Sequence, residues 1–165
     1  MSENPDKSNG NAASEARPRQ RRRDDYRFPG ERIAQMRIAS RPDCLRLVRA
    51  VVNEAGNANG CSDECISQMV MAVDEACQNI IRHAYGGDPD GEIVVDIRRQ
   101  DDRIAIHLLD FADPVDVSKI KPRSLDDVKP GGLGTRFIQE CVDECGFLTP
   151  PDGAGNCLRL VKIIT

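Results

Sequence analysis

Hydrophobic residues recur with a helical period through the middle of the chain, over residues 66–84. At 100° per residue their positions fall within an arc of about 120°, which predicts a long amphipathic helix. Ser62 is placed to cap the first turn of this helix, and Gly86 is expected to end it. Glu75 lies opposite the centre of the apolar arc, with Asn79 beside it on the polar side. These two side chains are therefore predicted to point away from the core.

The remaining hydrophobic pattern predicts a sheet and two further helices. Alternating polar and apolar residues indicate strands at 31–38, 91–98, 103–109 and 156–164, with a short strand at 147–149. Helical periodicity indicates helices at about 42–55, capped by Ser40, and at 133–142. Most successive strands have no helix between them, so the sheet is expected to be mixed and mostly antiparallel. With the helices on one face, the predicted fold is a two-layer α/β (α+β) sandwich.

Composition separates a tail from a domain. The chain has 165 residues, enough for one domain and a tail. Large apolar residues are almost absent from residues 1–28, which predicts a disordered N-terminal tail ahead of one domain at residues 29–165. The basic run at residues 17–23 is either a docking or nucleic-acid patch or a solvated part of the tail, and the pattern favours the second.

Charge and hydropathy narrow the possible partners. A net charge of −4 gives the protein no general attraction to nucleic acid or to a membrane surface. No apolar run approaches the roughly 20 residues that span a bilayer, and the N-terminus has no signal-peptide pattern. We therefore expect a cytoplasmic protein that binds neither nucleic acid nor membrane directly.

Seven cysteines are expected to be reduced in that compartment. Cys61 and Cys65, like Cys141 and Cys145, are spaced i,i+4, which on helices places each pair on one face. A four-cysteine metal or redox site is one interpretation of these pairs. The usual zinc spacing of two intervening residues is absent, so small buried apolar residues are the favoured interpretation.

Three polar segments carry candidate chemistry: residues 74–79 on the long helix, 110–114 after a strand, and 131–135 before a helix. Glu75 and Asn79 are i,i+4 neighbours, where a carboxylate can accept a hydroxyl proton and an amide oxygen can bind Mg²⁺. Glycines ahead of a helix expose backbone N–H groups that can bind phosphate. Taken singly, each segment is also compatible with a solvated helix face, a turn or a flexible connector.

Together, the three segments resemble the GHKL ATP-binding domain with its Bergerat fold, over roughly residues 31–165. The chain is most similar to bacterial anti-sigma-factor serine/threonine kinases. Residues 75–79 match the N box, Asp110 opens the first glycine box, and residues 131–134 match the second. The resemblance implies ATP and Mg²⁺ as cofactors, Glu75 as the catalytic base, Asn79 as the Mg²⁺ ligand and Asp110 as the acceptor for the adenine amino group.

The same resemblance implies a set of nucleotide-binding residues and a lid between residues 115 and 130. The implied set is Asp110, Ala112, Lys119, Arg123, Gly131, Gly132, Leu133, Gly134, Thr135 and Asn156. The chain departs from the family at the first glycine box, Asp-x-Gly-x-Gly, where Ala112 and Pro114 replace the glycines. It also has Asn156 where the family often has a threonine by the adenine, and this asparagine can still hydrogen-bond to the base.

The implied function is that of an ATP-dependent serine/threonine protein kinase and anti-sigma factor. Such a protein phosphorylates an anti-anti-sigma (STAS-type) antagonist and sequesters a sigma factor in a partner-switching pathway, and the resemblance implies a homodimer. One alternative is a nucleotide-binding module that sequesters a partner without phosphotransfer. Another is a metal or redox sensor built on the cysteine pairs.

Overall fold

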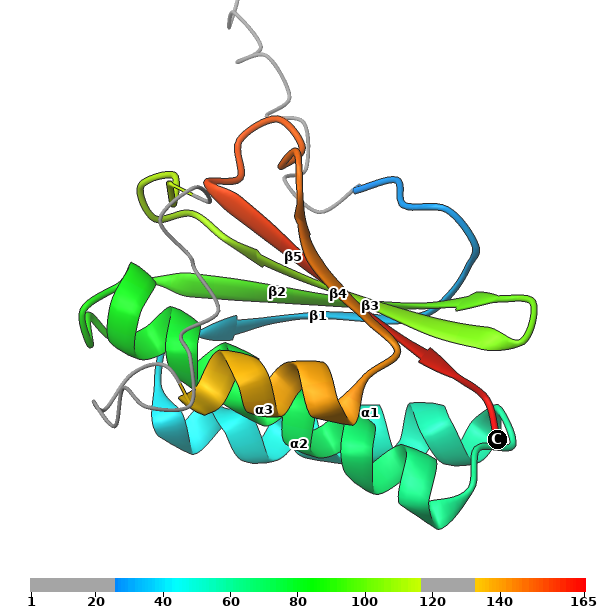
Figure 1. Cartoon of the computed structure of the whole chain (residues 1–165). Helices are drawn as coiled ribbons and strands as arrows, with labels where there is room; N and C mark the ends of the chain where they lie inside the picture. The colour runs from blue at the N-terminus through cyan, green and yellow to red at the C-terminus, as the bar shows by residue number, and fades with distance from the viewer. Residues whose placement is uncertain (1–25, 117–132) are drawn as a thin grey trace, which may run out of the picture.

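Residues 26–116 and 133–165 are described by the computed structural model, and they form an antiparallel sheet with helices on one face (Figure 1). In sequence order the strands are β1 (Glu31–Ala39), β2 (Glu92–Gln100), β3 (Arg103–Asp110), β4 (Glu144–Leu148) and β5 (Asn156–Ile163). In space their order is β1-β2-β3-β5-β4, and every neighbouring pair is antiparallel. The helices are α1 (Leu45–Ala58), α2 (Asp63–Asn79) and α3 (Leu133–Cys141). The predicted two-layer fold class is confirmed.

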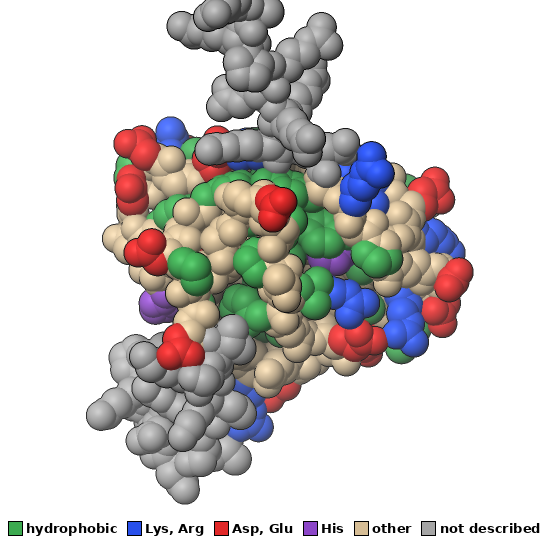
Figure 2. Space-filling model, turned by 90° about the horizontal axis from the view of Figure 1, so that it is seen from above, with side chains coloured by type: hydrophobic (Ala, Val, Ile, Leu, Met, Phe, Trp, Pro, Cys, Tyr) green, Lys and Arg blue, Asp and Glu red, His purple; other side chains and the backbone are tan. Residues whose placement is uncertain are grey.

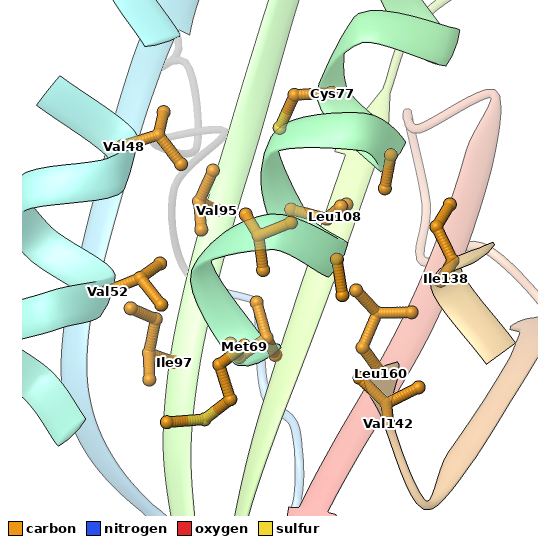
Figure 3. Packing of buried hydrophobic residues seen from close by; sticks show 14 of the residues in the cluster. Val48, Val52, Met69, Cys77, Val95, Ile97, Leu108, Ile138, Val142 and Leu160 are labelled. Atoms are coloured by element: carbon orange, nitrogen blue, oxygen red, sulfur yellow. The ribbon is translucent and has the colours of Figure 1, made fainter. Parts of the chain in front are cut away.

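The hydrophobic core lies between the helices and one face of the sheet (Figure 3). The alternation of β2 and β3 sends Val95, Ile97 and Leu108 toward the helices, where they meet Met69 and Cys77 of α2. Each of these side chains is at most 1% exposed. Burial of a side chain of this size contributes about 1.5–3 kcal/mol, so this layer fixes α2 against the sheet.

The buried surface of α2 is wider than its sequence indicates. Ala72 and Ala76 lie outside the predicted apolar arc, yet they are 0% and 1% exposed. The reason is tertiary, because α2 is the middle helix and packs against both α1 and α3. Ile138 on α3 belongs to the same core. Glu75 still reaches solvent, with 24% of its side chain exposed.

The start of α2 is as predicted, whereas the start of the first helix is not. The Ser62 hydroxyl accepts a hydrogen bond of 3.2 Å from the Cys65 N–H and caps α2. Ser40 does not cap its helix, because Arg41 occupies the cap position of a short 3₁₀ turn, Pro42–Cys44, that precedes α1. The Ser40 backbone N–H instead donates to the carbonyl of Gly91 at 2.7 Å, which ties the end of β1 to the start of β2.

A π-helical turn, Ile80–Ala84 (η2), continues α2 before the chain turns at Gly86. In this turn the Tyr85 N–H bonds to the Ile80 carbonyl, five residues back, at 3.1 Å. Such a turn inserts one extra residue into the helix, and π-helical turns are frequent at functional sites. β4 also begins three residues earlier than predicted, because its pairing with β5 already starts at Glu144, opposite Val161.

The other face of the sheet is partly covered by residues 26–30, which we call the N-terminal strap. The Phe28 ring stacks on His107 with centroids 3.8 Å apart, and Tyr26 is 6% exposed. Arg98 donates to the carbonyls of Tyr26 and Phe28 at 3.0 and 2.7 Å. Of the predicted tail, residues 1–28, only the last three lie within the described residues, and two of them pack on the sheet. Figure 2 looks at this face and shows hydrophobic side chains over its middle.

The cysteine pairs do not form a shared metal site in the part of the chain that the structure describes. All seven thiols are free. Cys141 ends α3 whereas Cys145 lies in β4, so this pair does not share one helix face. Across residues 26–116 and 133–165 no group of three or more His, Cys, Asp or Glu side chains could hold a metal ion. Cys65 and Cys141 are buried whereas Cys61 and Cys145 are half-buried, so the interpretation as buried residues holds for one member of each pair. Burial raises the pKa of Cys77 to about 12 and that of Cys157 to about 11.

Candidate functional site

A cavity of about 460 Å³ opens where the C-terminal end of α2 meets α3 and the strands β3, β4 and β5. Its walls come from α2 and η2, from α3, and from the strands with the segment after β3. They comprise Ala76, Asn79, Ile80, His83, Ala84, Asp110, Val115, Thr135, Ile138, Gln139, Cys145, Gly146, Phe147 and Leu158. A pocket of this volume with apolar walls and a few polar side chains is typical of a small-molecule site.

Asp110 ends β3 at this cavity and is 4% exposed. Its Oδ1 accepts hydrogen bonds from the Asn156 amide at 2.8 Å and from the Ala112 N–H at 3.1 Å. Burial raises the pKa of the Asp110 carboxyl above its usual value, and these two donors partly offset that effect. The result is a buried acceptor with a fixed orientation.

The two residues of the predicted N box have different surroundings. Asn79 lines the cavity from the last turn of α2. Glu75 lies one turn earlier, and its carboxylate is 3.8 Å from the Arg82 guanidinium. Glu75 is not among the described residues that line the cavity. The helix therefore brings Asn79 to the cavity, while Glu75 lies one turn away and outside the cavity lining.

Ala112 lies in the turn after Asp110, and the other predicted site residues divide into four groups. Thr135, in the first turn of α3, lines the cavity. Asn156 is 6% exposed and lies behind Asp110, to which it is paired across β3 and β5. Leu133 and Gly134 are placed in α3 by their backbone. The remaining predicted residues, Lys119, Arg123, Gly131 and Gly132, lie outside the described residues, as does most of the predicted lid.

Tyr85 does not line the cavity but bonds to the residue after Asp110, and the sequence pattern did not single it out. Its hydroxyl donates to the Glu92 carbonyl at 2.6 Å and accepts from the Phe111 N–H at 2.8 Å. Burial raises the pKa of this phenol, so the hydroxyl keeps the proton that it donates. A Cβ atom at Gly91 would lie 2.6 Å from the Tyr85 ring, which explains the glycine there. The only sequence signal was a tyrosine directly after the helix.

The residues present fit a purine nucleotide with Mg²⁺. The apolar walls and the buried Asp110 acceptor suit a base that carries an amino group. The Asn79 amide offers a neutral oxygen, and Mg²⁺ is usually bound through one or two protein oxygens together with phosphates.

The described residues of the chain include no helix long and apolar enough to cross a bilayer.

Comparison with known proteins agrees with this geometry. Serine-protein kinases RsbW are similar in sequence: that of Oceanobacillus iheyensis is 27% identical over 118 residues, which cover 67% of this chain and 75% of the relative. The RsbW of Bacillus subtilis is 25% identical over 118 residues, covering 67% and 74%. The RsbW of Listeria monocytogenes is 26% identical over 117 residues, covering 66% and 74%. The similarity to bacterial serine kinases that the sequence indicated is confirmed.

A solved structure has the same fold. The crystal structure of the RsbU and RsbW domains of a Mycobacterium tuberculosis protein matches with a TM-score of 0.57 and 20% identity. The match covers 79% of this chain and 31% of that one, so it is a likeness of fold. The model of the histidine kinase-like ATPase domain matches residues 38–162. The chain therefore belongs to the histidine kinase-like ATPase domain family.

Proposed function

We propose that this protein is an ATP-dependent serine/threonine protein kinase that phosphorylates an anti-anti-sigma (STAS-type) protein and sequesters a sigma factor. The observation that carries the proposal is that Asn79, Asp110 and Thr135, from three separate elements, line one cavity. Similarity to the RsbW serine-protein kinases supports the reaction class and the partner-switching role. A homodimer is part of the same proposal and is tested by the mass of the protein in solution.

In the proposed reaction the Asp110 carboxylate accepts a hydrogen bond from the adenine amino group and so orients the base. The Asn79 amide oxygen would hold Mg²⁺, and the bound ion would neutralise negative charge on the phosphates of ATP. Glu75 takes the proton from the serine or threonine hydroxyl of the substrate as its oxygen attacks the γ-phosphorus. The bond to the bridging oxygen breaks, and ADP leaves.

Glu75→Gln tests the catalytic assignment, because the amide keeps the shape of the side chain but cannot accept the proton. Transfer of ³²P from ATP to purified STAS-domain candidates is expected to fall by at least about 100-fold, while ADP affinity measured by calorimetry stays near the wild-type value. Glu64→Gln is the matched control, since Glu64 is an exposed carboxylate in the first turn of the same helix. It is expected to leave both measurements unchanged. Labelling by Glu75→Gln at the wild-type rate would contradict the assignment.

A nucleotide-binding module without phosphotransfer is the second candidate. It is favoured by the position of Glu75, whose carboxylate faces Arg82 at 3.8 Å while the cavity is lined by other residues. In that case the wild-type protein binds ADP and captures a partner in a nucleotide-dependent way but labels no STAS candidate. Partner affinity in the presence of ATP, ADP and no nucleotide separates this candidate from the kinase.

A further inference from the structure

The turn after Asp110 is built without the glycines that the family has there. Ala112 and Pro114 occupy those positions, and neither has a positive φ; among the described residues Asp101 is the one non-glycine residue that does. The turn therefore uses backbone conformations open to any residue. One restraint is internal, the hydrogen bond from the Ala112 N–H to Asp110 Oδ1, and others come from β5 and the residue before it.

Asn156, the first residue of β5, makes three hydrogen bonds to this turn. Its Nδ2 donates to Asp110 Oδ1 at 2.8 Å and to the Asp113 carbonyl at 3.2 Å. Its Oδ1 accepts from the Val115 N–H at 2.8 Å. Two acceptors face the amide nitrogen and one donor faces the oxygen, so the partners themselves determine the orientation of the amide. Both of its N–H groups and its oxygen are used within the protein.

Gly155 lets the same strand approach the turn closely. Its backbone N–H donates to the Asp110 carbonyl at 2.8 Å. A Cβ atom at this position would lie 1.9 Å from the Ala112 carbonyl oxygen, well inside van der Waals contact. The close approach of the chain to the turn therefore requires a glycine directly before β5.

These contacts also distinguish the two oxygens of the Asp110 carboxylate. Within residues 26–116 and 133–165 its side-chain hydrogen bonds, from Asn156 and Ala112, both end on Oδ1. Oδ2 is then the oxygen that remains for a donor in the cavity. If the amide of Asn156 were removed, the carboxylate would lose its strongest positional restraint and could rotate about χ2.

We infer that Asn156 is a positioning residue for nucleotide recognition: it fixes the turn from Asp110 to Val115 and presents Asp110 Oδ2 to the amino group of the base. This inference rests on the proposed function, because it takes an adenine nucleotide as the ligand of the cavity. It assigns Asn156 no direct contact with the base, since its hydrogen-bonding groups are already paired. Recognition of the base amino group thereby depends on a side chain behind the cavity wall.

Calorimetry with ADP and with inosine diphosphate tests the inference, because inosine has a carbonyl oxygen where adenine has its amino group. Asn156→Ala is expected to lower ADP affinity about 10-fold and to change inosine diphosphate affinity little, so that the preference for ADP shrinks. In the kinase assay the KM for ATP rises while kcat at saturating ATP stays within about twofold. Asn156→Thr, whose hydroxyl can still donate to Asp110, is expected to recover part of the preference and serves if the alanine variant does not fold. Asn57→Ala, at an exposed position on α1, is the matched control.

The possible outcomes are distinguishable. Equal losses of ADP and inosine diphosphate affinity in both Asn156 variants would show a purely structural residue and overturn the inference. Wild-type affinity and preference in Asn156→Ala would also overturn it, with the proposed function intact. Failure of the wild-type chain to bind ADP would overturn the proposed function, and the positioning role with it.

Discussion

The Tyr85 hydroxyl oxygen lies 2.8 Å from the backbone nitrogen of Phe111, although 26 positions separate the two residues. The same hydroxyl donates to the Glu92 carbonyl at 2.6 Å. One side chain at the end of the long helix therefore ties together the start of β2 and the residue after Asp110. Asp110 is the proposed acceptor for the base, so the hydrogen bond from the Phe111 N–H to Tyr85 links the end of the helix to the base site.

Tyr85→Phe removes both hydrogen bonds and keeps the ring. We expect the free energy of unfolding to fall by about 1 kcal/mol, since the Phe111 N–H loses its partner in a half-buried setting. ADP affinity is expected to fall several-fold, because the turn after Asp110 becomes less restrained. Urea unfolding and calorimetry measure the two effects.

Two further variants serve as controls for Tyr85→Phe. Tyr26→Phe removes the other tyrosine hydroxyl of the chain, which belongs to the strap side of the sheet, and should leave ADP affinity unchanged. Gly91→Ala should reproduce the loss, because the added methyl group would lie 2.6 Å from the Tyr85 ring. Unchanged ADP affinity in both Tyr85→Phe and Gly91→Ala would show that this connection does not reach the base site.

Gly155→Ala is expected to displace the turn after Asp110. The added Cβ atom would lie 1.9 Å from the Ala112 carbonyl oxygen, and backbone atoms must move to relieve that overlap. We expect a loss of about 2 kcal/mol in the free energy of unfolding, in the usual range for overpacking. Gly146→Ala is the matched control for stability, because a Cβ atom there would meet nothing within 4 Å. Equal stability of the two variants would contradict the packing of β5 against this turn.

The sequence predicted those features that depend on local periodicity or on a contiguous motif. The long helix, its Ser62 cap and the β2–β3 hairpin each depend on residues close together in the chain, and all three were predicted. The burial of Ala72 was not predicted, because it depends on where α3 packs. The three hydrogen bonds of Asn156 were not predicted either, because its partners lie 41 to 46 positions away across a strand pairing.

His107 is predicted to make the stability of the protein depend on pH. Its side chain is 1% exposed, stacks on Phe28 and lies 3.9 Å from Asp96. Burial lowers the pKa of His107 to about 4, against the opposing effect of Asp96 and with smaller contributions from Arg159 and Arg98. In the unfolded chain the histidine has a pKa of about 6.5, so between pH 6.5 and 4 it binds a proton that it does not bind in the folded state. The contribution of neutral His107 to the free energy of unfolding is therefore fully present above pH 6.5. It is lost as the pH falls toward 4, and the total loss is about 3 kcal/mol.

The two histidines of the chain provide an internal control for this pH effect. Urea unfolding of wild type, His107→Gln and His83→Gln between pH 7.5 and about 4.5 should separate the contribution of His107 from that of the carboxylates. His83 is exposed, so its variant is expected to keep the wild-type slope. A His107→Gln variant whose stability falls as steeply with acid as the wild type would contradict the prediction.

The Asp96–Arg98 pair is predicted to hold the strap on the sheet. Asp96 is fully buried, and its Oδ1 lies 2.6 Å from Arg98 Nε, while the Arg98 guanidinium donates to the carbonyls of Tyr26, Phe28 and Gly30. Arg98→Met leaves the carboxylate with Gln35 and Arg32 as polar partners and with His107 at 3.9 Å. We expect a loss of about 3 kcal/mol, because removing one member of a buried ion pair leaves an incompletely compensated charge.

Release of the strap can be measured separately from global stability. Trypsin cleavage after Arg27, followed by mass spectrometry under native conditions, should become several-fold faster in Arg98→Met. In that variant the Phe28 carbonyl loses its Arg98 donor, and the Tyr26 carbonyl keeps Arg32 as a donor but loses Arg98. Arg46→Met, at an exposed position on α1, is the matched control and should cleave like the wild type. The double variant Asp96→Asn/Arg98→Met should recover part of the stability, since it removes the buried charge, but should keep the fast cleavage. Slow cleavage in both Arg98 variants would show that the strap is held by the Phe28–His107 stack rather than by the guanidinium.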